Sequence, residues 1–497
     1  MRKKYFGIAG FGIAGQSILR FYKNFYVEFS NCLSQYSQDD STEIEWLLKV
    51  FDEKSLNEKQ KQLLLESNVS IETDVDTFLE AVDLVWFSTG IDINRFSLKK
   101  EKIIKEVDIF HMLWKKPIIG ITGTIGKTTL TQLLYELFMI DSCASYEGVV
   151  ERSCTHLRGC SYQRVALGGN IGVGLLDLVP HQPLYRKALL ELSSWQLEES
   201  NCFSPDIGIW MNLYDNHLDR HGSKKQYFRA KSMFLRHQKK GDIALLGSSL
   251  IEGENKDIFV AEISKWQADL FIIFDRAIVE DEKVFLNKFN CSYVSVENEQ
   301  VVLHRTGSEK QNICLINLFN SKGFLDTWIF SVIALFFSGV TISMLTKEHF
   351  EQAYNRCRNV AGQHRLELCA EKNALFFYND SKSTVPYATQ AAITHLKQQH
   401  EKIILITGGL NKGADRSDLI TFVEKDPSIK LALRFGPGSV DLEPLEYFDT
   451  LDSLLQEAVQ RADPGDAILF SPSGSSFDLY ENYKKRGDHF IQLVQKL

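Results

Sequence analysis

The stretch PIIGITGTIGKTTLTQLLYELF, residues 117–138, constrains the fold of this chain more than any other feature. Its apolar start predicts a buried strand, its glycines a tight turn, and its leucines at helical spacing a helix. Backbone N–H groups of such a turn can face phosphate oxygens, Lys127 can neutralise phosphate charge, and the Thr128 hydroxyl can bind Mg²⁺. The predicted nucleotide-binding turn comprises Gly123, Thr124, Ile125, Gly126, Lys127, Thr128 and Thr129.

A second glycine turn lies near the start of the chain, in YFGIAGFGIAGQSILRFY. Gly10, Gly12 and Gly15 have the GxGxxG spacing that brings backbone close to a phosphate at a helix N-terminus. The same spacing also occurs in a simple tight connection between strand and helix. A dinucleotide site would need an acidic residue about 20 residues further on. The polar stretch NCLSQYSQDDSTEIEW intervenes, and Asp52 is the next candidate.

Polar side chains in the central part of the sequence are candidates for a metal site. Glu191 ends the predicted strand KALLEL, where a carboxylate is unusual unless it binds a cation. His217 lies in the loop YDNHLD, and Lys231 lies eight residues into a helix predicted to start at Ser223. Asn170 follows another strand. The alternatives are an edge-strand charge for Glu191, a solvated histidine, and an ordinary surface lysine.

Three strand-and-loop units occur near the end of the chain: ALFFYNDSKST, KIILITGGLNKGAD and DAILFSPSGSSFDLYENYKKRG. Ligands of open α/β sheets gather at the carboxyl ends of strands. Asp380, Lys382, Lys412, Ser473 and Ser476 all follow strands and are therefore candidates for one shared site. Asp380 could instead cap the next helix, and Lys412 could be a solvated loop charge.

The composition excludes several classes of protein. A net charge of −8 gives no electrostatic reason to expect nucleic acid or an anionic membrane as a partner. Nine dispersed cysteines without a CxxC pair are typical of a reducing compartment. The apolar segment 324–340 lacks charge only over 327–340, so we expect a buried helix rather than a membrane span. We therefore expect a cytoplasmic protein without membrane insertion.

The alternation of apolar strands with helical stretches predicts an α/β protein with largely parallel sheets. Its 497 residues are enough for two to four domains. We expect three: a Rossmann-like N-terminal domain over 1–97, a central P-loop ATPase-type domain over 98–361, and a Rossmann-like C-terminal domain over 362–497.

The motifs occur in an order that resembles the Mur ligases. The short phosphate turn is followed by GGNIG, ELSSWQL and NLYDNHLDRHGS with a lysine after it, then by HRLE, NDSK, GGLNKGAD and SPSGSSFD. Within that family, ELSSWQLE resembles the signature of the members that add D-glutamate to UDP-N-acetylmuramoyl-L-alanine. The resemblance spans nearly the whole chain.

The resemblance implies an activity. ATP would phosphorylate the carboxylate of UDP-N-acetylmuramoyl-L-alanine, and the amine of D-glutamate would attack the acyl phosphate. The UDP end would bind the first domain, ATP and metals the second, and the amino acid the third. We expect a monomer whose partners are these small molecules and not nucleic acid.

The resemblance also assigns residues. The catalytic set is Lys127, Glu191, His217 and Lys231. Two Mg²⁺ ions would be held by Thr128 with Glu191, and by His217 with Lys231 in its carbamylated form. Further nucleotide contacts are Arg365 and Asp380. The UDP-substrate residues are Gly10, Gly12, Ile13, Ala14, Gly15, Asp52, Asn170 and Ser193. The amino-acid residues are Lys382, Thr384, Lys412, Ser476, Phe477 and Tyr483.

The sequence departs from the family pattern at several positions. Ile125 and Val385 stand where asparagine is common, and Asn216 replaces an aspartate. Gly323 and Asp326 fall where the family has asparagine and histidine near adenine, and residues 31–46 are extra. Three other functions stay open: a relative that uses another acceptor such as L-glutamate, an NAD-dependent oxidoreductase built on the first glycine turn, and a non-enzymatic nucleotide-binding regulator.

Overall fold

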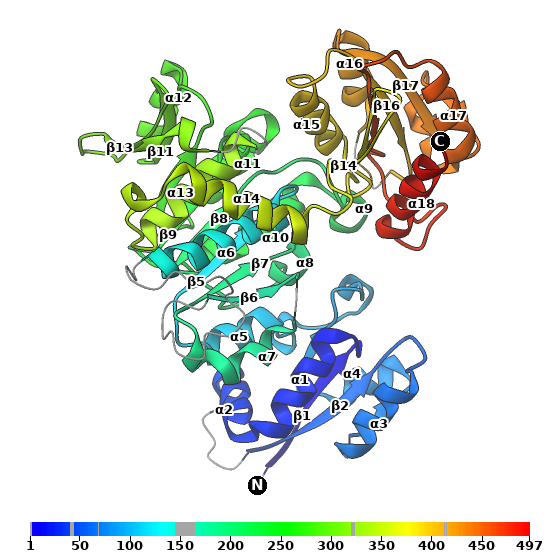
Figure 1. The fold of residues 1–497 in the computed structure, drawn as a ribbon. Coiled ribbons are helices and arrows are strands. Elements are labelled where there is room, and N and C mark those ends of the chain that lie inside the picture. The colour runs from blue at the N-terminus through cyan, green and yellow to red at the C-terminus, as the bar shows by residue number, and fades with distance from the viewer. Residues whose placement is uncertain are drawn as a thin grey trace. The chain divides into compact units, whose positions relative to one another are not determined.

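A computed structural model gives the fold of the chain. It describes residues 2–39, 44–67, 69–144, 165–171, 173–319, 324–411, 413 and 415–497, without the side chains of 94, 141–144, 359 and 361. Within these ranges the strands form three sheets of four, nine and six strands, and most neighbouring strands are parallel (Figure 1). The predicted α/β class with largely parallel sheets is confirmed.

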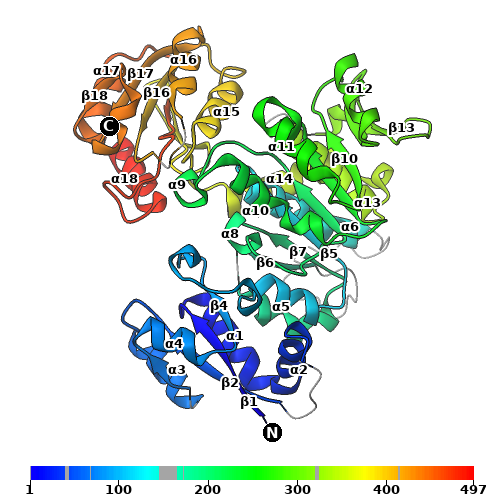
Figure 2. The ribbon, with the colours of Figure 1, turned by 180° about the vertical axis from the view of Figure 1, so that it is seen from behind.

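The first sheet is parallel and has the strand order β3-β2-β1-β4. Its strands are β1 (Arg2–Ala9), β2 (Ile44–Phe51), β3 (Ile71–Glu72) and β4 (Leu84–Phe87). Its helices are α1 (Ile13–Asn24), α2 (Tyr26–Tyr36), α3 (Glu58–Glu66) and α4 (Val75–Ala81). Figures 1 and 2 show α1 and α2 on one face of the sheet and α3 and α4 on the other. The extra residues 31–46 thus include the end of an additional helix, α2.

The second sheet has the order β13-β12-β11-β10-β9-β8-β5-β7-β6. Its strands are β5 (Ile118–Thr122), β6 (Val165–Gly169), β7 (Lys187–Glu191), β8 (Ile207–Trp210), β9 (Ile243–Gly247), β10 (Asp269–Ile273), β11 (Ser292–Glu297), β12 (Gln300–His304) and β13 (Gln311–Leu315). β12 pairs antiparallel with β11 and with β13, and all other neighbouring strands pair parallel. The inner strands are continuous apolar runs because both faces of a parallel sheet are covered.

Ten α-helices lie before, between and after these strands in the described sequence. They are α5 (Glu106–Leu113), α6 (Lys127–Ala144), α7 (Leu175–Leu178), α8 (Ser194–Leu197), α9 (Leu218–His221), α10 (Lys224–Arg236), α11 (Gly253–Ile263), α12 (Glu280–Lys288), α13 (Leu325–Phe337) and α14 (Lys347–Ala361). The apolar segment 324–340 forms α13, which is buried and packs on α6 and on β8, β9 and β10. The prediction of a buried helix is confirmed, and no helix in the described ranges is long and apolar enough to cross a membrane.

The third sheet has the order β14-β15-β19-β16-β17-β18, with only β14 antiparallel to its neighbour. Its strands are β14 (Glu367–Lys372), β15 (Leu375–Asn379), β16 (Ile403–Gly408), β17 (Ile429–Phe435), β18 (Glu446–Phe448) and β19 (Ala467–Phe470). Its helices are α15 (Pro386–Leu396), α16 (Ser417–Lys425), α17 (Leu451–Gln460) and α18 (Tyr483–Lys496). Apolar clusters lie on both faces of the sheet, under these helices.

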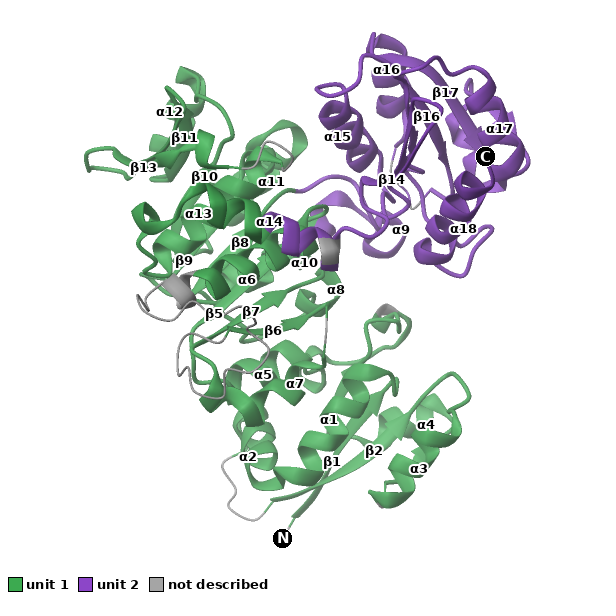
Figure 3. Cartoon of the chain, in the orientation of Figure 1, with its two compact units in different colours: residues 1–212, 228–353 green, residues 213–227, 354–497 purple. Residues whose placement is uncertain are grey.

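The chain divides into two compact units (Figure 3). Residues 1–212 and 228–353 form the first unit, which holds the first two sheets. Residues 213–227 and 354–497 form the second unit, which holds the third sheet. Each predicted domain thus contains one sheet, and the boundaries at 97/98 and 361/362 stay predictions.

Candidate functional site

The predicted phosphate turn lies between the end of β5 at Thr122 and the start of α6 at Lys127. Gly123 has φ +155° and Gly126 has φ +83°, a region that residues with a side chain rarely adopt. A Cβ on Gly126 would lie 2.8 Å from the Cε of Met211. The conformation of the turn therefore requires glycine at both positions.

Sequence order alone did not reveal which strands flank this turn. In the sheet, β5 lies between β7 and β8, so the residues that follow those two strands lie on either side of the turn. Glu191 ends β7, and Asn212 follows β8. The alternative that Glu191 is an edge-strand charge is wrong, because β7 pairs with β5 on one side and β6 on the other.

Asn212 holds the turn and was missed by the sequence analysis. Its Oδ1 accepts hydrogen bonds from the backbone N–H groups of Thr124 and Ile125, both at 3.0 Å. Its Nδ2 donates to the carbonyl of Ile125 at 3.2 Å. The backbone of Ile125 is fixed in this way whatever its side chain, so the departure at this position leaves the turn intact. A buried amide just after the apolar strand IGIWM was the signal that could have identified Asn212.

Two lysines meet at one carbonyl oxygen of the turn. Lys127 Nζ donates to the carbonyls of Gly123 at 2.9 Å and Thr124 at 3.1 Å. Lys231 Nζ donates to the same Gly123 carbonyl at 2.7 Å and to Thr122 Oγ1 at 3.3 Å. Lys231 is 1% exposed, so the alternative of a surface lysine is wrong. Its helix, α10, begins after the predicted cap Ser223, whose Oγ accepts from Gln226 N.

The environment of Lys231 disfavours its charged form. Burial lowers its pKa well below the ordinary value, and the nearby Lys127 charge lowers it further. The Glu191 carboxylate acts in the opposite direction but is the smallest of the three effects. The side chain is therefore biased toward the neutral amine, which is a nucleophile.

Asn170, in the loop that follows the neighbouring strand β6, makes two hydrogen bonds with Glu191. Glu191 Oε1 accepts from Asn170 Nδ2 at 2.9 Å, and the Glu191 carbonyl accepts from Asn170 N at 2.8 Å. Gly169 permits this approach, because a Cβ there would lie 2.1 Å from the Glu191 carbonyl oxygen. Asn170 and Glu191, which were predicted for different roles, are thus in direct contact.

The second carboxylate oxygen of Glu191 fits a cation. Glu191 Oε2 is buried and has no hydrogen-bond partner among the described residues. A buried carboxylate oxygen in that condition is costly unless a cation or water binds it. Thr128, in the first turn of α6, supplies a half-buried hydroxyl. The described ranges contain no group of three His, Cys, Asp or Glu that could hold a metal; the predicted ligand set includes only two such residues.

His217 belongs to the second compact unit, whereas Lys127, Glu191 and Lys231 belong to the first. It has φ +56° and lies at the N-terminal end of α9. Asn216 beside it is buried, and its Oδ1 has no hydrogen-bond partner in the described part of the chain. The structure brings three of the four predicted catalytic residues together, and the convergence of His217 with them stays a prediction.

The first glycine turn connects β1 to α1 as predicted. Gly10 has φ +95°, and a Cβ on Gly15 would lie 2.5 Å from the Gly10 carbonyl oxygen. Asp52, at the end of β2, accepts hydrogen bonds from Phe11 N at 2.6 Å and from Lys54 N at 2.8 Å. The Asp52 carboxylate therefore supports the glycine turn. The additional helix α2 lies between Asp52 and this turn in the sequence.

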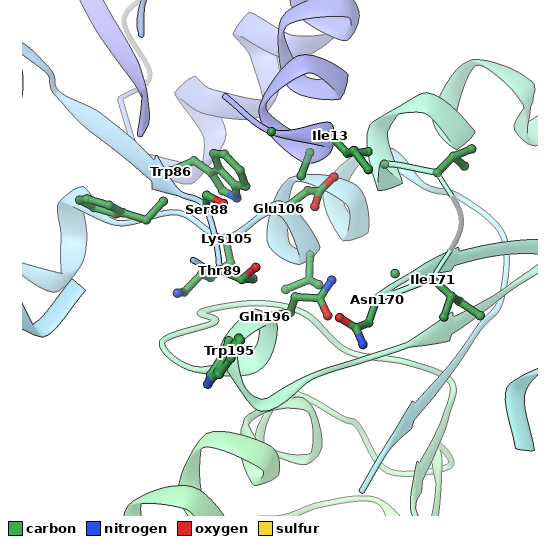
Figure 4. Close-up of a pocket in the computed structure, with 17 residues that line it drawn as sticks. Ile13, Trp86, Ser88, Thr89, Lys105, Glu106, Asn170, Ile171, Trp195 and Gln196 are labelled. Carbon is green, nitrogen blue, oxygen red and sulfur yellow. The ribbon is translucent and has the colours of Figure 1, made fainter. Parts of the chain in front are cut away.

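A cavity of about 310 Å³ opens between this turn and the loops of the second sheet (Figure 4). Four predicted UDP-substrate residues line it: Gly12, Ile13, Ala14 and Asn170. The sequence analysis missed lining residues from three other segments, among them Trp86, Ser88, Lys105, Glu106, Trp195 and Gln196. Ser193 does not line the cavity; its hydroxyl caps α8 through Gln196. Gly10, Gly15 and Asp52 shape the turn behind it.

Polar contacts fasten the first sheet's α1 to the second sheet's α7. Arg20 makes two hydrogen bonds to the Asp177 carboxylate, at 3.0 and 2.6 Å, and Asp177 N donates to Ser17 Oγ at 3.0 Å. The Glu106 carboxylate accepts from Leu175 N at 2.9 Å, and burial raises the pKa of Glu106 to about 7. The cavity is therefore walled by segments that already contact one another.

In the third sheet, strands β15, β19 and β16 are neighbours, so their predicted polar residues lie at adjacent strand ends. Asp380 accepts from Leu366 N at 3.0 Å and Ser471 Oγ at 2.7 Å, and burial raises its pKa to about 7. The alternative that Asp380 caps the next helix is wrong, because α15 starts after Val385 with no side-chain cap. Ser473 Oγ lies 3.0 Å from Thr407 Oγ1.

The predicted amino-acid residues differ in how accessible they are. Phe477 is 69% exposed, Lys382 and Thr384 are half-buried, and Ser476 is buried. Lys382 Nζ lies 5.5 Å from the centre of the Tyr483 ring. Arg365 acts on Asp380 by charge. Lys412 and Gly323 lie outside the described residues. Their binding roles stay predictions.

Arg486 was missed by the sequence analysis. It is 1% exposed and donates to the carbonyls of Ser381 at 2.8 Å and Gly474 at 3.0 Å. Burial lowers its pKa to about 10. It therefore fastens two of the loops that carry predicted amino-acid residues.

Comparison with known proteins identifies the family. Residues 121–319 match the Mur ligase middle domain, and residues 364–474 match the Mur ligase glutamate ligase domain. The UDP-N-acetylmuramoylalanine--D-glutamate ligase of Geobacillus kaustophilus is 29% identical over 436 residues, 84% of each chain. The enzyme of the same name from Geobacillus sp. strain WCH70 is 28% identical over 433 residues, again 84% of each chain.

Solved structures share the fold. A crystal structure of MurF from Acinetobacter baumannii has a TM-score of 0.53 at 16% identity, over 93% of this chain and 98% of that one. MurF ligase from Thermotoga maritima in complex with ADP has a TM-score of 0.51 at 14% identity, over 90% and 95%. The two family-model matches and the sequence relatives, together with the order of the motifs, establish that the chain belongs to the Mur ligase family.

Proposed function

We propose that this chain is an ATP-dependent amide ligase that joins D-glutamate to the alanine carboxylate of UDP-N-acetylmuramoyl-L-alanine, a step in peptidoglycan precursor synthesis. The observation that carries the proposal is the cluster of Lys127, Lys231 and Glu191 around the phosphate turn. Two lysines share one carbonyl oxygen, and a carboxylate oxygen beside them has no hydrogen-bond partner among the described residues. The names of the sequence relatives supply the two substrates.

The cluster suits a reaction between two anions. A carboxylate and the γ-phosphate of ATP repel each other, so positive charge must lie between them in the transition state. Lys127 would move from the turn's own carbonyls to the β- and γ-phosphate oxygens. The N–H groups of the turn and of the first turn of α6 would face the same phosphates. The carboxylate would attack the γ-phosphorus, ADP would leave, and the amine would then displace phosphate from the acyl phosphate.

Mg²⁺ would neutralise phosphate charge when bound. Glu191 Oε2 and the Thr128 hydroxyl are the residues that would hold one ion, since the first is buried without a hydrogen-bond partner in the described ranges. His217 and a modified Lys231 would hold a second.

The depressed pKa of Lys231 supports the proposal that this lysine is carbamylated. Only a neutral amine attacks CO₂, and the bond that forms releases one proton and leaves a carbamate anion. Burial and Lys127 both favour the neutral amine. The product exchanges a repelling ammonium beside Lys127 for an anion that attracts it, so the modification removes the unfavourable charge.

ADP release in the presence of UDP-N-acetylmuramoyl-L-alanine tests the proposal. We expect sustained release only when D-glutamate is also present, and much slower release with L-glutamate. Release that depends on L-glutamate instead would assign the other acceptor. No release that requires both the UDP substrate and an amino acid would overturn the proposal and favour a nucleotide-binding regulator; binding of NAD would favour an oxidoreductase.

The variant Lys231→Ala tests the role of the carbamate. We expect it to be inactive and to regain part of its activity when a short-chain carboxylate such as acetate is added, because the added anion replaces the carbamate. Chloride at the same ionic strength is the control. Equal activity of wild type and variant without added carboxylate would show that the reaction does not require Lys231.

A further inference from the structure

Three loops of the second compact unit meet at the carboxyl edge of the third sheet. They follow β17, β16 and β19, which are neighbours in that order, so the loop after β16 is the middle one. A Cβ on Gly409 would lie 2.4 Å from the Ser475 carbonyl oxygen, and a Cβ on Gly438 would lie 2.7 Å from Leu410 N. The backbone of the middle loop is therefore in direct contact with the backbones of both neighbouring loops.

Two of these loops carry residues that the family resemblance assigns to the amino acid. Lys412 belongs to the sequence of the middle loop, and Ser476 and Phe477 belong to the loop after β19. Leu410 N donates to the Ser475 carbonyl at 2.9 Å, and Ser475 N donates to the Leu410 carbonyl at 2.8 Å. These two hydrogen bonds join the loops directly before Ser476. The position of the middle loop therefore determines where Ser476 lies.

A buried arginine fastens the middle loop to the loop after β17. Arg416, which directly follows the motif GGLNKGAD, is 2% exposed. Its Nη1 donates to the carbonyls of Gly408 at 3.3 Å and Gly409 at 3.1 Å, and its Nη2 donates to the Gly438 carbonyl at 2.9 Å. Its Nε and Nη2 also pair with the Asp441 carboxylate, the Nε bond at 2.8 Å. All five N–H donors of the guanidinium group are thus used, and both loops supply acceptors.

The ion pair also neutralises a charge on loops that are expected to bind a dicarboxylate. The Asp441 side chain is 39% exposed, whereas that of Arg416 is fully buried. Gly438 N, on the same loop as Asp441, donates to Asp478 Oδ2 at 3.2 Å, so this loop also contacts the one that carries Phe477. Without Arg416, the Asp441 carboxylate would lose its cation and would repel the carboxylates of a bound glutamate.

We propose that Arg416 and Asp441 are positioning residues for the amino-acid acceptor, because their ion pair fixes the loops after β16 and β19 in the arrangement that binds it. The inference rests on the proposed function for the identity of the acceptor. Asp380, a predicted nucleotide contact, accepts from Leu366 N and Ser471 Oγ and is therefore held without Arg416. The pair should act on the acceptor and not on ATP.

The kinetics of Arg416→Met in the full-length protein test the proposal. Steady-state ADP release would give kcat and the KM of each substrate. We expect the KM for D-glutamate to rise about 10- to 100-fold, since charge-assisted hydrogen bonds are lost and Asp441 is left without its cation. The KM values for ATP and for the UDP substrate should stay within about 2-fold of wild type. At saturating D-glutamate kcat should change little, a separation that a general loss of structure would not produce.

Hydrogen exchange read by mass spectrometry tests the geometry without turnover. Peptides that cover residues 408–411 and 473–476 should exchange faster in Arg416→Met than in wild type, because the hydrogen bonds between Leu410 and Ser475 open more often. A peptide that covers β14 and β15 should exchange at the wild-type rate.

Arg461→Met is the matched control. Arg461 also makes two hydrogen bonds to one carboxylate, that of Glu446, at 2.8 and 3.1 Å. Its ion pair is exposed, and such pairs contribute little, so this variant should have wild-type KM values and wild-type exchange of both loop peptides. Arg416→Lys keeps the charge but has about three donors in place of five, so its KM for D-glutamate should lie between those of wild type and Arg416→Met.

Three results would overturn the inference: a wild-type KM for D-glutamate in Arg416→Met, an equal rise in the KM of all three substrates, or unchanged exchange of the two loop peptides. If Arg416→Met fails to fold, Arg416→Lys and Asp441→Asn decide by the same comparison of KM values. Absence of acceptor-dependent turnover in the wild type would contradict the proposed function and the inference with it. Wild-type turnover together with an unchanged KM in the variant would contradict the inference alone.

Discussion

The two glycine turns of the first compact unit have the same local plan and different surroundings. Each follows a parallel strand and precedes a helix, with β1 and α1 at Gly10–Gly15 and β5 and α6 at Gly123–Gly126. In the second turn, the backbone makes hydrogen bonds to Asn212 and to two lysines that share one carbonyl oxygen. The first is supported from behind by Asp52 and faces a cavity.

On the proposed function, each glycine turn fixes where a phosphate would lie, whereas the neighbouring side chains determine which chemistry follows. Lysines and Glu191 crowd the second turn, which suits a phosphate that must be transferred. The first turn has one buried cation nearby and an open front. That arrangement suits a phosphate that is held without reaction.

The largest expected effect separates the two turns by activity. Lys127→Met should lower kcat/KM for ATP by about 100- to 1,000-fold, because charge aimed at the transferred phosphate is lost. The Kd of the UDP substrate, measured without ATP, should stay within about 2-fold, since the first turn is untouched. A comparable loss in both measurements would mean that the two turns do not work separately.

Asn212→Ala tests how far the second turn depends on its neighbour strand. Two N–H groups would lose their acceptor, at a cost of about 1–3 kcal/mol in the free energy of unfolding. Denaturant titration would measure this, with ATP binding assayed at a temperature where the variant is folded. Asn411→Ala, an exposed amide on the second unit, is the control. If Asn212→Ala had the stability and the ATP affinity of the wild type, the conformation of the turn would not depend on Asn212.

A matched pair of glycine variants sharpens the comparison. Gly126→Ala should destabilise the protein by about 1–2 kcal/mol, because its φ is +83° and Met211 is close. Gly12→Ala should cost less than about 1 kcal/mol, since its φ is −75° and its Cβ meets nothing. Gly12→Ala should nevertheless lower the affinity of the protein for the UDP substrate. Thermal unfolding and calorimetry would check both, and the reverse order of stabilities would contradict the geometry.

The smallest effect concerns pH and is confined to the second turn. In protein whose Lys231 is not carbamylated, the folded-state pKa of Lys231 lies below its unfolded value near 10.5, so the unfolded chain binds more protons between the two. Stability should therefore rise with pH through that window, with a contribution from Lys231 of at most about 1.4 kcal/mol per pH unit. Lys231→Met should lack this contribution. Denaturant titrations from pH 7.5 to 10 that show a constant difference between wild type and variant would contradict it.

The sequence by itself determined the local units and their order. Strand, turn and helix at both glycine turns follow from apolar runs, glycines and helical spacing within about 20 residues, and so does the buried helix α13. The spacing of the glycines made both turns identifiable, and the positive φ angles of Gly10, Gly123 and Gly126 explain why glycine is needed at those three positions. Glu191 was identifiable because a carboxylate at the end of an apolar strand requires a reason, Lys127 because it follows the glycines of the phosphate turn, and Lys231 through the family resemblance.

Only the tertiary structure decided which of these units became neighbours. Asn212 and Glu191 flank the phosphate turn because β5 pairs with β8 and β7, an order that no local pattern specifies. Lys105 and Trp195 line the same cavity although 90 positions separate them, and a single sequence contains no signal that brings these two segments to one cavity. Burial likewise set the pKa directions of Lys231 and Glu106, because a side chain's desolvation depends on everything packed around it rather than on its neighbours along the chain.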